Sequence, residues 1–209
     1  MDNSTSQAVK RHFFTLDGIN NSRNSHTWSH DKPHERSVTK FEKKFLVNLW
    51  CGLLGNKLIV PFAFDNNLTG NTYEVFLRNE LPGLLEDIPL RIRSQMYLQH
   101  DGAPPHYTRH VTEYLYESFP NRWLGRGGPV AWPLKSPDLT PLDYYLWGHM
   151  KTLVYETKFD SRAALRRRIF AAAEQIKNHP HNTACATGSL KIRVENCIAA
   201  GGGHFEHIL

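Results

Sequence analysis

Apolar positions change their spacing partway along the chain, from a strand-like pattern to a helix-like one. Two β-rich stretches come first, residues 12–29 and 44–64, and each is divided by a glycine-containing turn, Asp17-Gly18 and Gly55-Asn56. Such turns between apolar runs indicate β-hairpins. The N-terminal part therefore predicts two hairpins, preceded by a polar and disordered tail over residues 1–10.

The apolar residues of 68–88 recur at helical spacing, which predicts a helix that Pro82 kinks or ends near Glu80. Beyond it, short strands alternate with helices. The predicted strands are 95–100 and 126–132, and the predicted helices are 107–119, 140–155, 161–178 and 190–201. Strands followed by an alternation of helix and strand are typical of a mixed sheet with helices packed on it, an α/β fold.

Composition narrows the class of protein only in part. The length of 209 residues suits one domain. Its content of 40% hydrophobic and 22% charged residues is typical of a globular protein that buries a core. A net charge of +5 favours a polyanionic partner, although many basic proteins bind no nucleic acid. No stretch approaches the ~18 apolar residues of a membrane span. The 3 widely spaced cysteines indicate no disulfide framework and favour cytosol or nucleus.

Two aspartates have both a structural and a chemical interpretation. Asp101, in "YLQHDGAPPH", stands where a predicted strand meets a chain-breaking stretch, a common place for a turn residue. Asp143 falls in the first turn of a helix predicted to begin at Thr140 and Pro141, where a carboxylate is electrostatically favoured. Carboxylates that converge at strand ends also bind pairs of Mg²⁺ or Mn²⁺ ions for phosphoryl transfer. The residues alone leave both interpretations open.

The motif "HDGAPPH" at 100–106, followed by "WPLKSPDLTPLDYYLWGHMK" at 132–151, resembles the catalytic domain of mariner-type (DDE/DDD) transposases, with colinear similarity over most of the chain. The resemblance implies a ribonuclease-H-like domain that cuts and joins DNA with two Mg²⁺ or Mn²⁺ ions held by an acidic triad. It assigns Asp101 as the second acidic residue and Asp143 as the third, both catalytic and metal-binding. Asp138 matches a position outside the triad that shapes the loop.

Three further residues are candidates for substrate binding. His106 is expected near the site, either in contact with substrate or as a structural histidine at a helix start. Lys135 and Arg126 are candidates for contacts with backbone phosphates. The implied partner is DNA in the nucleus, with no small-molecule substrate and no membrane, and the resemblance is compatible with a homodimer. The run Arg166 to Arg168 is interpreted as a solvated helix face or, alternatively, as a phosphate-contacting patch.

The chain departs from the family pattern at its first acidic position. That position falls on Lys10, and nothing acidic stands between Asp2 and Asp17. Asp17 comes 17 − 10 = 7 residues later, about 23 Å along an extended chain, so it is a poor substitute. The triad is therefore predicted to be incomplete and catalysis impaired. No helix-turn-helix module precedes the first strand, so sequence-specific DNA binding is not supported. A truncated or decayed element copy, or a gene model begun too late, is expected.

The predicted organisation is a tail over 1–10, a catalytic domain with an incomplete first strand over 11–180, and a helical tail over 181–209. Two functions from different classes stay open. One is a transposase-derived domain related to metal-dependent DNA cleavage and strand transfer. The other is a non-catalytic DNA-binding or assembly module, and a non-functional remnant is the third alternative.

Overall fold

The centre of the molecule is a mixed five-stranded sheet with the strand order β3-β2-β1-β4-β5. The computed structural model describes residues 6–15, 46–132 and 136–208. The strands are β1 (Ser6–Phe14), β2 (Val47–Leu54), β3 (Lys57–Phe64), β4 (Tyr97–Gln99) and β5 (Trp123–Leu124). β2 is antiparallel to both β1 and β3, whereas β4 runs parallel to β1 and to β5. This is the mixed sheet that the order of sequence patterns predicts.

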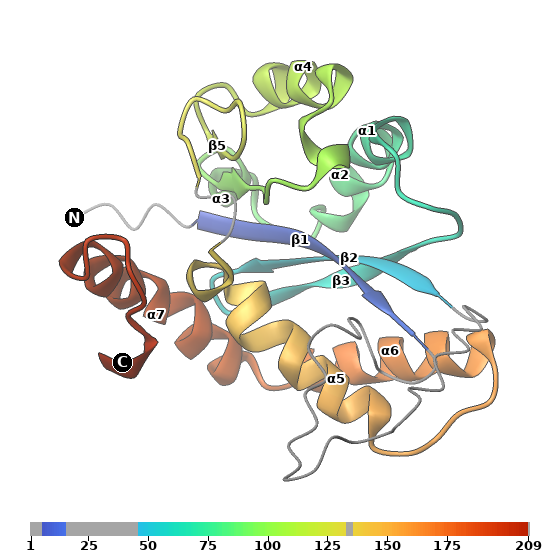
Figure 1. The fold of residues 1–209 in the computed structure, drawn as a ribbon. Helices are drawn as coiled ribbons and strands as arrows, with labels where there is room; N and C mark the ends of the chain where they lie inside the picture. The colour runs from blue at the N-terminus through green and yellow to red at the C-terminus, as the bar shows by residue number, and fades with distance from the viewer. Residues whose placement is uncertain (1–5, 16–45, 133–135, 209) are drawn as a thin grey trace, which may run out of the picture.

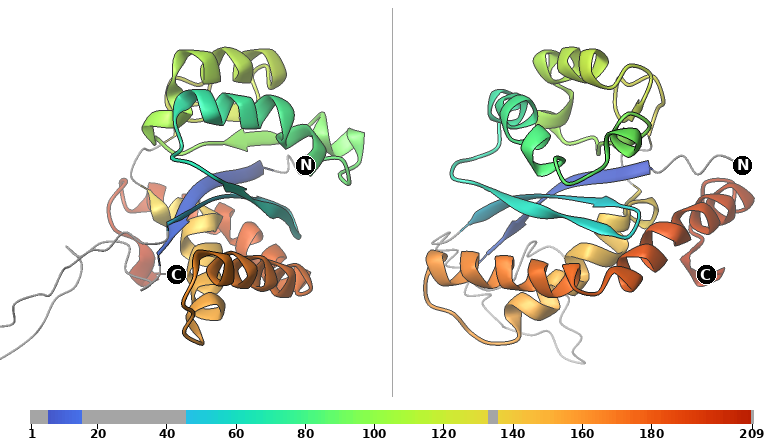
Figure 2. Two further views of the ribbon diagram at one scale, coloured as in Figure 1. Left: turned by 90° about the vertical axis from the view of Figure 1, so that its right-hand side faces the viewer. Right: turned by 180° about the vertical axis from the view of Figure 1, so that it is seen from behind.

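Helices cover both faces of this sheet, as Figure 1 and the two further views in Figure 2 show. On one face lie α1 (Gly70–Asn79), α2 (Leu81–Leu84), α3 (Leu90–Arg93) and α4 (Arg109–Ser118). On the other lie α5 (Trp147–Tyr155), α6 (Arg162–Lys177) and α7 (Pro180–Ala199). Among the described residues, none of the helices is long and apolar enough to cross a bilayer.

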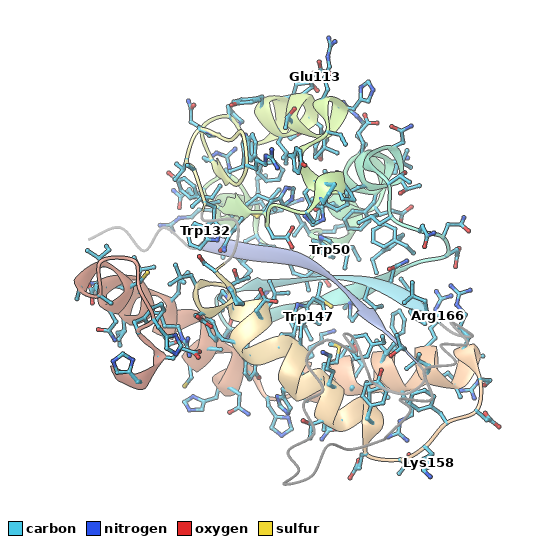
Figure 3. The ribbon with its side chains drawn as sticks, in the orientation of Figure 1. Trp50, Glu113, Trp132, Trp147, Lys158 and Arg166 are labelled. Carbon is cyan, nitrogen blue, oxygen red and sulfur yellow. The ribbon has the colours of Figure 1, made fainter. Side chains whose placement is uncertain are left out.

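Strand β2 is buried on both of its faces and therefore joins two separate cores. Trp50 and Leu54 pack with α1 and α4, whereas Leu49 and Leu53 pack with α5 and α6. Successive side chains of a strand point to opposite faces, so a central strand with a helix layer on each side needs apolar residues throughout. The labelled tryptophans in Figure 3 lie on the two sides of the sheet, Trp50 in one core and Trp147 in the other.

The first strand is the element that the sequence predicted least well. Residues 6–10 belong to β1, so the predicted disordered tail over 1–10 is wrong for them. Their polar sequence carries no strand signal of its own, and β1 is held by pairing with β2 on one side and β4 on the other. The predicted turn at Asp17-Gly18 lies outside the described residues.

Local chemistry predicted the elements that follow well. The second hairpin turns at Gly55-Asn56, where Gly55 has a φ of 57°, a left-handed conformation that glycine adopts without strain. Helix α1 begins after Thr69, whose hydroxyl accepts from the Thr72 amide, and it ends at Asn79, ahead of Pro82. These elements are confirmed because their turn and cap residues act over a few positions.

One predicted strand is wrong, and one predicted helix exists but begins ten residues earlier than expected. The strand expected at 126–132 is a turn, and β5 lies earlier, where the buried Trp123 pairs with β4. Gly127 has a φ of 79°, and a Cβ at Gly128 would stand 2.8 Å from the Trp123 ring, so this loop wraps the tryptophan closely. The helix expected at 190–201 begins at Pro180, because its first half lacks the apolar stripe on which the sequence pattern depended.

We predict that Leu98→Ala lowers the free energy of unfolding by about 2–5 kcal/mol, because Leu98 is fully buried in β4 and its truncation leaves a cavity. Urea denaturation followed by circular dichroism measures the change. Leu90→Ala is the matched control, since Leu90 is 71% exposed and its truncation should cost less than about 0.5 kcal/mol. Equal losses in the two variants would contradict this packing.

Candidate active site

Asp101 lies two residues beyond the end of β4, and its carboxylate has two described partners. Oδ1 accepts a hydrogen bond from the Ala103 amide at 3.0 Å and another from Nδ1 of His106 at 2.5 Å. The first is the turn-forming bond that aspartate commonly makes to the backbone two residues on. The second fixes the carboxylate against a short helical turn, η2 (Pro104–Tyr107). Asp101 therefore has a structural role as well as a position at a strand end.

His106 is a buried partner of Asp101 rather than an exposed group. It is 1% exposed, and its ring lies 4.5 Å from the Tyr73 ring and 5.2 Å from the His100 ring, centroid to centroid. An ionised carboxylate only accepts hydrogen bonds, so Nδ1 of His106 is the donor in this pair. The histidine contacts Asp101, and its burial favours support of Asp101 over direct contact with a substrate.

Tyr73 and His100 continue this buried network away from the carboxylate. The Tyr73 hydroxyl and Nε2 of His100 are 2.9 Å apart. Burial lowers the pKa of His100 to about 3, with the neighbouring His106 adding to the effect, so the ring is neutral. Burial, and then the negative charge of Asp101, raise the pKa of Tyr73. Sequence analysis missed both residues, and for Tyr73 no local signal existed, because it comes from α1.

Asp143 lies in a π-helical turn, η4 (Leu142–Leu146), that leads directly into α5. Its amide donates to the Thr140 carbonyl at 2.8 Å. Single π-helical turns inside longer helices occur often at functional sites. The Thr140 hydroxyl in turn accepts from Nε2 of Gln99 at 3.4 Å, which joins this turn to the end of β4. The structure thus brings the segment of Asp143 beside the strand that leads to Asp101.

A basic residue that sequence analysis missed also belongs to this region. Lys151 lies on α5, two helical turns beyond Asp143, and it is half-buried. Burial lowers the pKa of its ammonium group, while the negative charge of Asp143 opposes that shift. The spacing of eight residues, 151 − 143, was the available signal, since residues two turns apart share a helix face.

Strand register places residue 10 beside the chain that leads from β4 to Asp101. Ala8 of β1 stands opposite Gln99 of β4 in the parallel pair. Two residues further on, β1 reaches Lys10 and the chain after β4 reaches Asp101. Residue 10 also lies opposite Cys51 of β2, in the middle of the sheet. The position that the family resemblance assigns to the first acidic residue is thus occupied by a lysine.

Of the remaining predicted residues, the structure describes Arg126 and Asp138. The guanidinium carbon of Arg126 lies 4.1 Å from the centre of the Tyr107 ring, so this exposed cation stands beside the turn that holds Asp101. Asp138 is in a separate 3₁₀ turn, η3 (Pro137–Leu139), just ahead of Thr140. Lys135 lies outside the described residues.

The residues present do not fit a complete two-metal site. Among the residues that the structure describes, no three His, Cys, Asp or Glu side chains gather closely enough to hold a metal ion. Lys10 of β1 stands at the position that the family resemblance assigns to the first acidic residue, and a lysine neither ligates a divalent cation nor attracts one. The incomplete triad stays a prediction.

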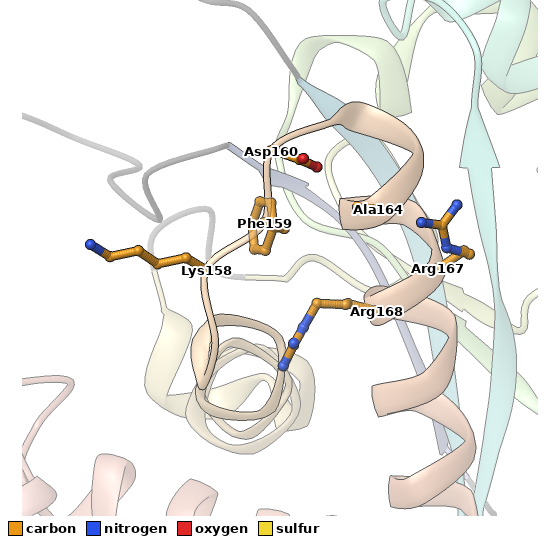
Figure 4. A pocket seen from close by; sticks show the side chains of 6 residues that line it. All are labelled: Lys158, Phe159, Asp160, Ala164, Arg167 and Arg168. Atoms are coloured by element: carbon orange, nitrogen blue, oxygen red, sulfur yellow. The ribbon is translucent and has the colours of Figure 1, made fainter.

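A hollow lies elsewhere, at the junction of α5 and α6 (Figure 4). It measures about 490 Å³, and its lining consists of Lys158, Phe159, Asp160, Ala164, Arg167 and Arg168. Arg168 is already used within the protein, where it donates to the Leu153 carbonyl at 3.1 Å and to the Thr157 hydroxyl. Arg166 lies 3.9 Å from Asp65. These contacts favour the interpretation of the arginine run as a helix face over a phosphate patch.

Comparison with solved structures shows the fold. The chain is similar to the catalytic domain of Mos1 mariner transposase, with a TM-score of 0.69 and 19% identity over 96% of this chain and 84% of that one. It is also similar to a pre-cleavage Mos1 transpososome, with a TM-score of 0.71 and 19% identity over 96% of this chain and 57% of that one. No family model and no curated protein matches the sequence. The predicted ribonuclease-H-like α/β fold is confirmed.

Proposed function

We propose that this chain is a mariner-type transposase domain that binds DNA and whose own cleavage and strand-transfer chemistry is impaired. One observation carries the proposal. In a fold similar to the Mos1 catalytic domain, Asp101 follows β4 and Asp143 lies on a π turn beside the end of that strand, and the register of β1 with β4 brings residue 10, a lysine, level with Asp101. The aspartates match the second and third members of the triad, and the lysine takes the place of the first.

The proposed partners follow from the same fold. Solved Mos1 structures include a paired-end complex with a left transposon end, a strand transfer complex, and catalytic domains with Mn and with Mg. We propose that this chain binds DNA in the nucleus, and that two copies pair on it. Divalent metal is the inherited cofactor, and this chain holds it weakly because Lys10 replaces a ligand.

Each candidate residue has a proposed role in this arrangement. Asp101 and Asp143 are the two retained acidic residues, and His106 positions Asp101 through its bond to Oδ1. Arg126, beside the turn that holds Asp101, binds backbone phosphates, and Lys135 is proposed for the same role from the sequence alone. A second candidate function, a non-catalytic DNA-binding or assembly module, is favoured by one observation alone, the lysine at residue 10.

We predict metal-independent, sequence-independent binding of duplex DNA, with a Kd of about 1–100 μM at physiological salt. Arg126→Gln and Lys135→Gln should each weaken binding to every sequence alike and reduce the slope of log K against log salt by about 1, because each removes one phosphate contact. Fluorescence anisotropy on a labelled duplex, titrated at several salt concentrations, measures both quantities.

The controls for this experiment separate charge from position. Lys191→Gln removes an 84% exposed cation from α7 and should leave the slope unchanged. Replacing Asp101 and Asp143 together by asparagine should leave affinity unchanged or raise it slightly, since two negative charges are lost. If the unaltered chain does not bind duplex DNA at low salt, the proposed function is wrong.

A further inference from the structure

The loop after β5 holds Arg126 at the tip of a closed turn. The Gly128 amide donates to the Gly125 carbonyl at 3.2 Å, and Gly127, the third residue of this turn, has a φ of 79°. A hydrogen bond across four residues with a positive φ at the third is typical of a type II β-turn, where glycine is favoured. The Gly125 amide also donates to the Val130 carbonyl at 3.2 Å, which closes the base of the loop. Arg126 carries the only charged side chain of this loop.

Contacts with two other elements hold the loop in place. A Cβ on Gly125 would stand 3.2 Å from Cβ of His100, so the base of the loop lies against the residue that precedes Asp101. The Tyr116 hydroxyl, on α4, donates to the Gly127 carbonyl at 3.0 Å. The backbone that carries Arg126 is therefore fixed relative to the end of β4.

Tyr107 holds the side chain that this backbone presents. The guanidinium carbon of Arg126 lies 4.1 Å from the centre of the Tyr107 ring, within the range of a cation–π contact. Tyr107 is the last residue of η2 and follows His106, which bonds the Asp101 carboxylate. Arg126 is exposed, and no carboxylate within the described part of the chain forms an ion pair with it. An ordered cation is thus presented to solvent beside the turn that holds Asp101.

We propose that Tyr107 is a positioning residue for DNA binding, whose ring fixes the Arg126 guanidinium in the direction that takes a backbone phosphate. This role rests on the proposed function, which gives Arg126 a phosphate contact, and it adds how that contact is made. A guanidinium is planar and carries its donors in a rigid fork, so its direction decides whether two of them meet one phosphate. Ordering a free arginine side chain during binding weakens affinity by about three- to tenfold, and a ring that orders it beforehand removes this loss.

The test measures the Kd of a labelled duplex by fluorescence anisotropy. Tyr107→Leu removes the ring and leaves every charge in place, so the Kd should rise about three- to tenfold. Tyr107→Phe keeps the ring and should bind within about twofold of the unaltered chain. In an Arg126→Gln chain, Tyr107→Leu should raise the Kd no further, because the ring acts only through the guanidinium.

Two further measurements examine the pair without a change in η2. Arg126→Lys keeps the charge and loses the planar fork, so its Kd should rise about threefold, even if Tyr107→Leu fails to unfold cooperatively. Proton NMR of the unliganded protein should show the δ protons of Arg126 shifted upfield by the face of the ring. The shift should persist in Tyr107→Phe and vanish in Tyr107→Leu.

The outcomes separate the role of Tyr107 from the proposed function. An unchanged Kd in Tyr107→Leu, or in Arg126→Lys, would overturn the positioning role while the proposed function stands. An equal rise caused by Tyr107→Leu in the Arg126→Gln chain would show a structural role for the tyrosine and would overturn it as well. Absence of the upfield shift in the unaltered chain would overturn the pair itself, whatever the affinity. Failure of the unaltered chain to bind duplex DNA would overturn the proposed function, and the role of Tyr107 with it.

Discussion

A Lys10→Asp variant is expected to nick supercoiled plasmid in the presence of Mn²⁺ at least about 100-fold faster than the unaltered chain. The substitution converts a cation into a carboxylate at the register position beside Asp101. Two charges near the surface and about 4 Å apart interact by about 4 kcal/mol, and 1.4 kcal/mol corresponds to a factor of ten. Exchange of a repulsion for an attraction therefore has the largest effect on metal binding of any single change beside Asp101.

Plasmid nicking and thermal unfolding with and without Mn²⁺ together measure this prediction. The Lys10→Asp protein should gain a Mn²⁺-dependent rise in Tm, because a ligand that binds only the folded state stabilises it. EDTA should abolish both the nicking and the rise. Lys57→Asp is the matched control, since Lys57 is an exposed lysine at the start of β3 and the change of charge is identical.

Two results would contradict the prediction in different ways. Mn²⁺-dependent nicking by the unaltered chain would mean that two carboxylates suffice and that Lys10 does not disable the site. Absence of Mn²⁺-dependent nicking by the Lys10→Asp protein, if that protein unfolds cooperatively, would favour the non-catalytic DNA-binding module. Equal activity of Lys57→Asp would assign the effect to net charge instead of position.

Asp143→Ala, introduced into the Lys10→Asp protein, is expected to reduce Mn²⁺-dependent nicking by at least about 100-fold. A carboxylate ligand is lost, and neither neighbour in the turn, Leu142 or Tyr144, can replace it. In the absence of metal the Tm should stay the same or rise, because one of three crowded negative charges is removed. Loss of activity with unreduced stability distinguishes a ligand from a structural residue.

Asp138→Ala in the same protein is the control for this second prediction. Asp138 is a half-buried aspartate five residues earlier, and its described contact is made by the backbone carbonyl, which the substitution retains. Its nicking rate should remain within about threefold of the parent, a change of less than 1 kcal/mol. A loss as large as that of Asp143→Ala would mean that the whole loop, and not one carboxylate, is required.

The sequence was most informative where local chemistry acts over a few residues. The Gly55-Asn56 turn lies where the sequence predicted it, and hydroxyl caps, Thr69 and Ser161, stand at the starts of the predicted helices α1 and α6. Caps and turns depend on hydrogen bonds between residues three or four positions apart, so the neighbouring residues in the sequence are enough to predict them. The ribonuclease-H-like fold was predicted from a resemblance carried by motifs that stretch over more than one element.

Strand β1 and the π turn show what local patterns miss. The polar residues that begin β1 form a strand because β2 and β4 supply hydrogen-bond partners on both sides, a contribution from segments far along the chain. A π turn at Leu142–Leu146 replaced the regular helix start expected at Thr140, since the contacts of Tyr144 with α7 come from over forty residues away. Such long-range terms outweigh intrinsic propensity.

By itself the sequence singled out Asp101 and Asp143 as candidates for the chemistry, and Lys10 as the position where the family resemblance leads one to expect an acidic residue. Only the tertiary structure determined where these residues lie relative to one another and to their neighbours. Register between β1 and β4 set the lysine beside Asp101, burial placed His106 behind the carboxylate, and the turn after β5 brought Arg126 onto the Tyr107 ring. Residue identity is a property of the chain, whereas the distances between distant residues depend on the packing of the whole sheet and its helices.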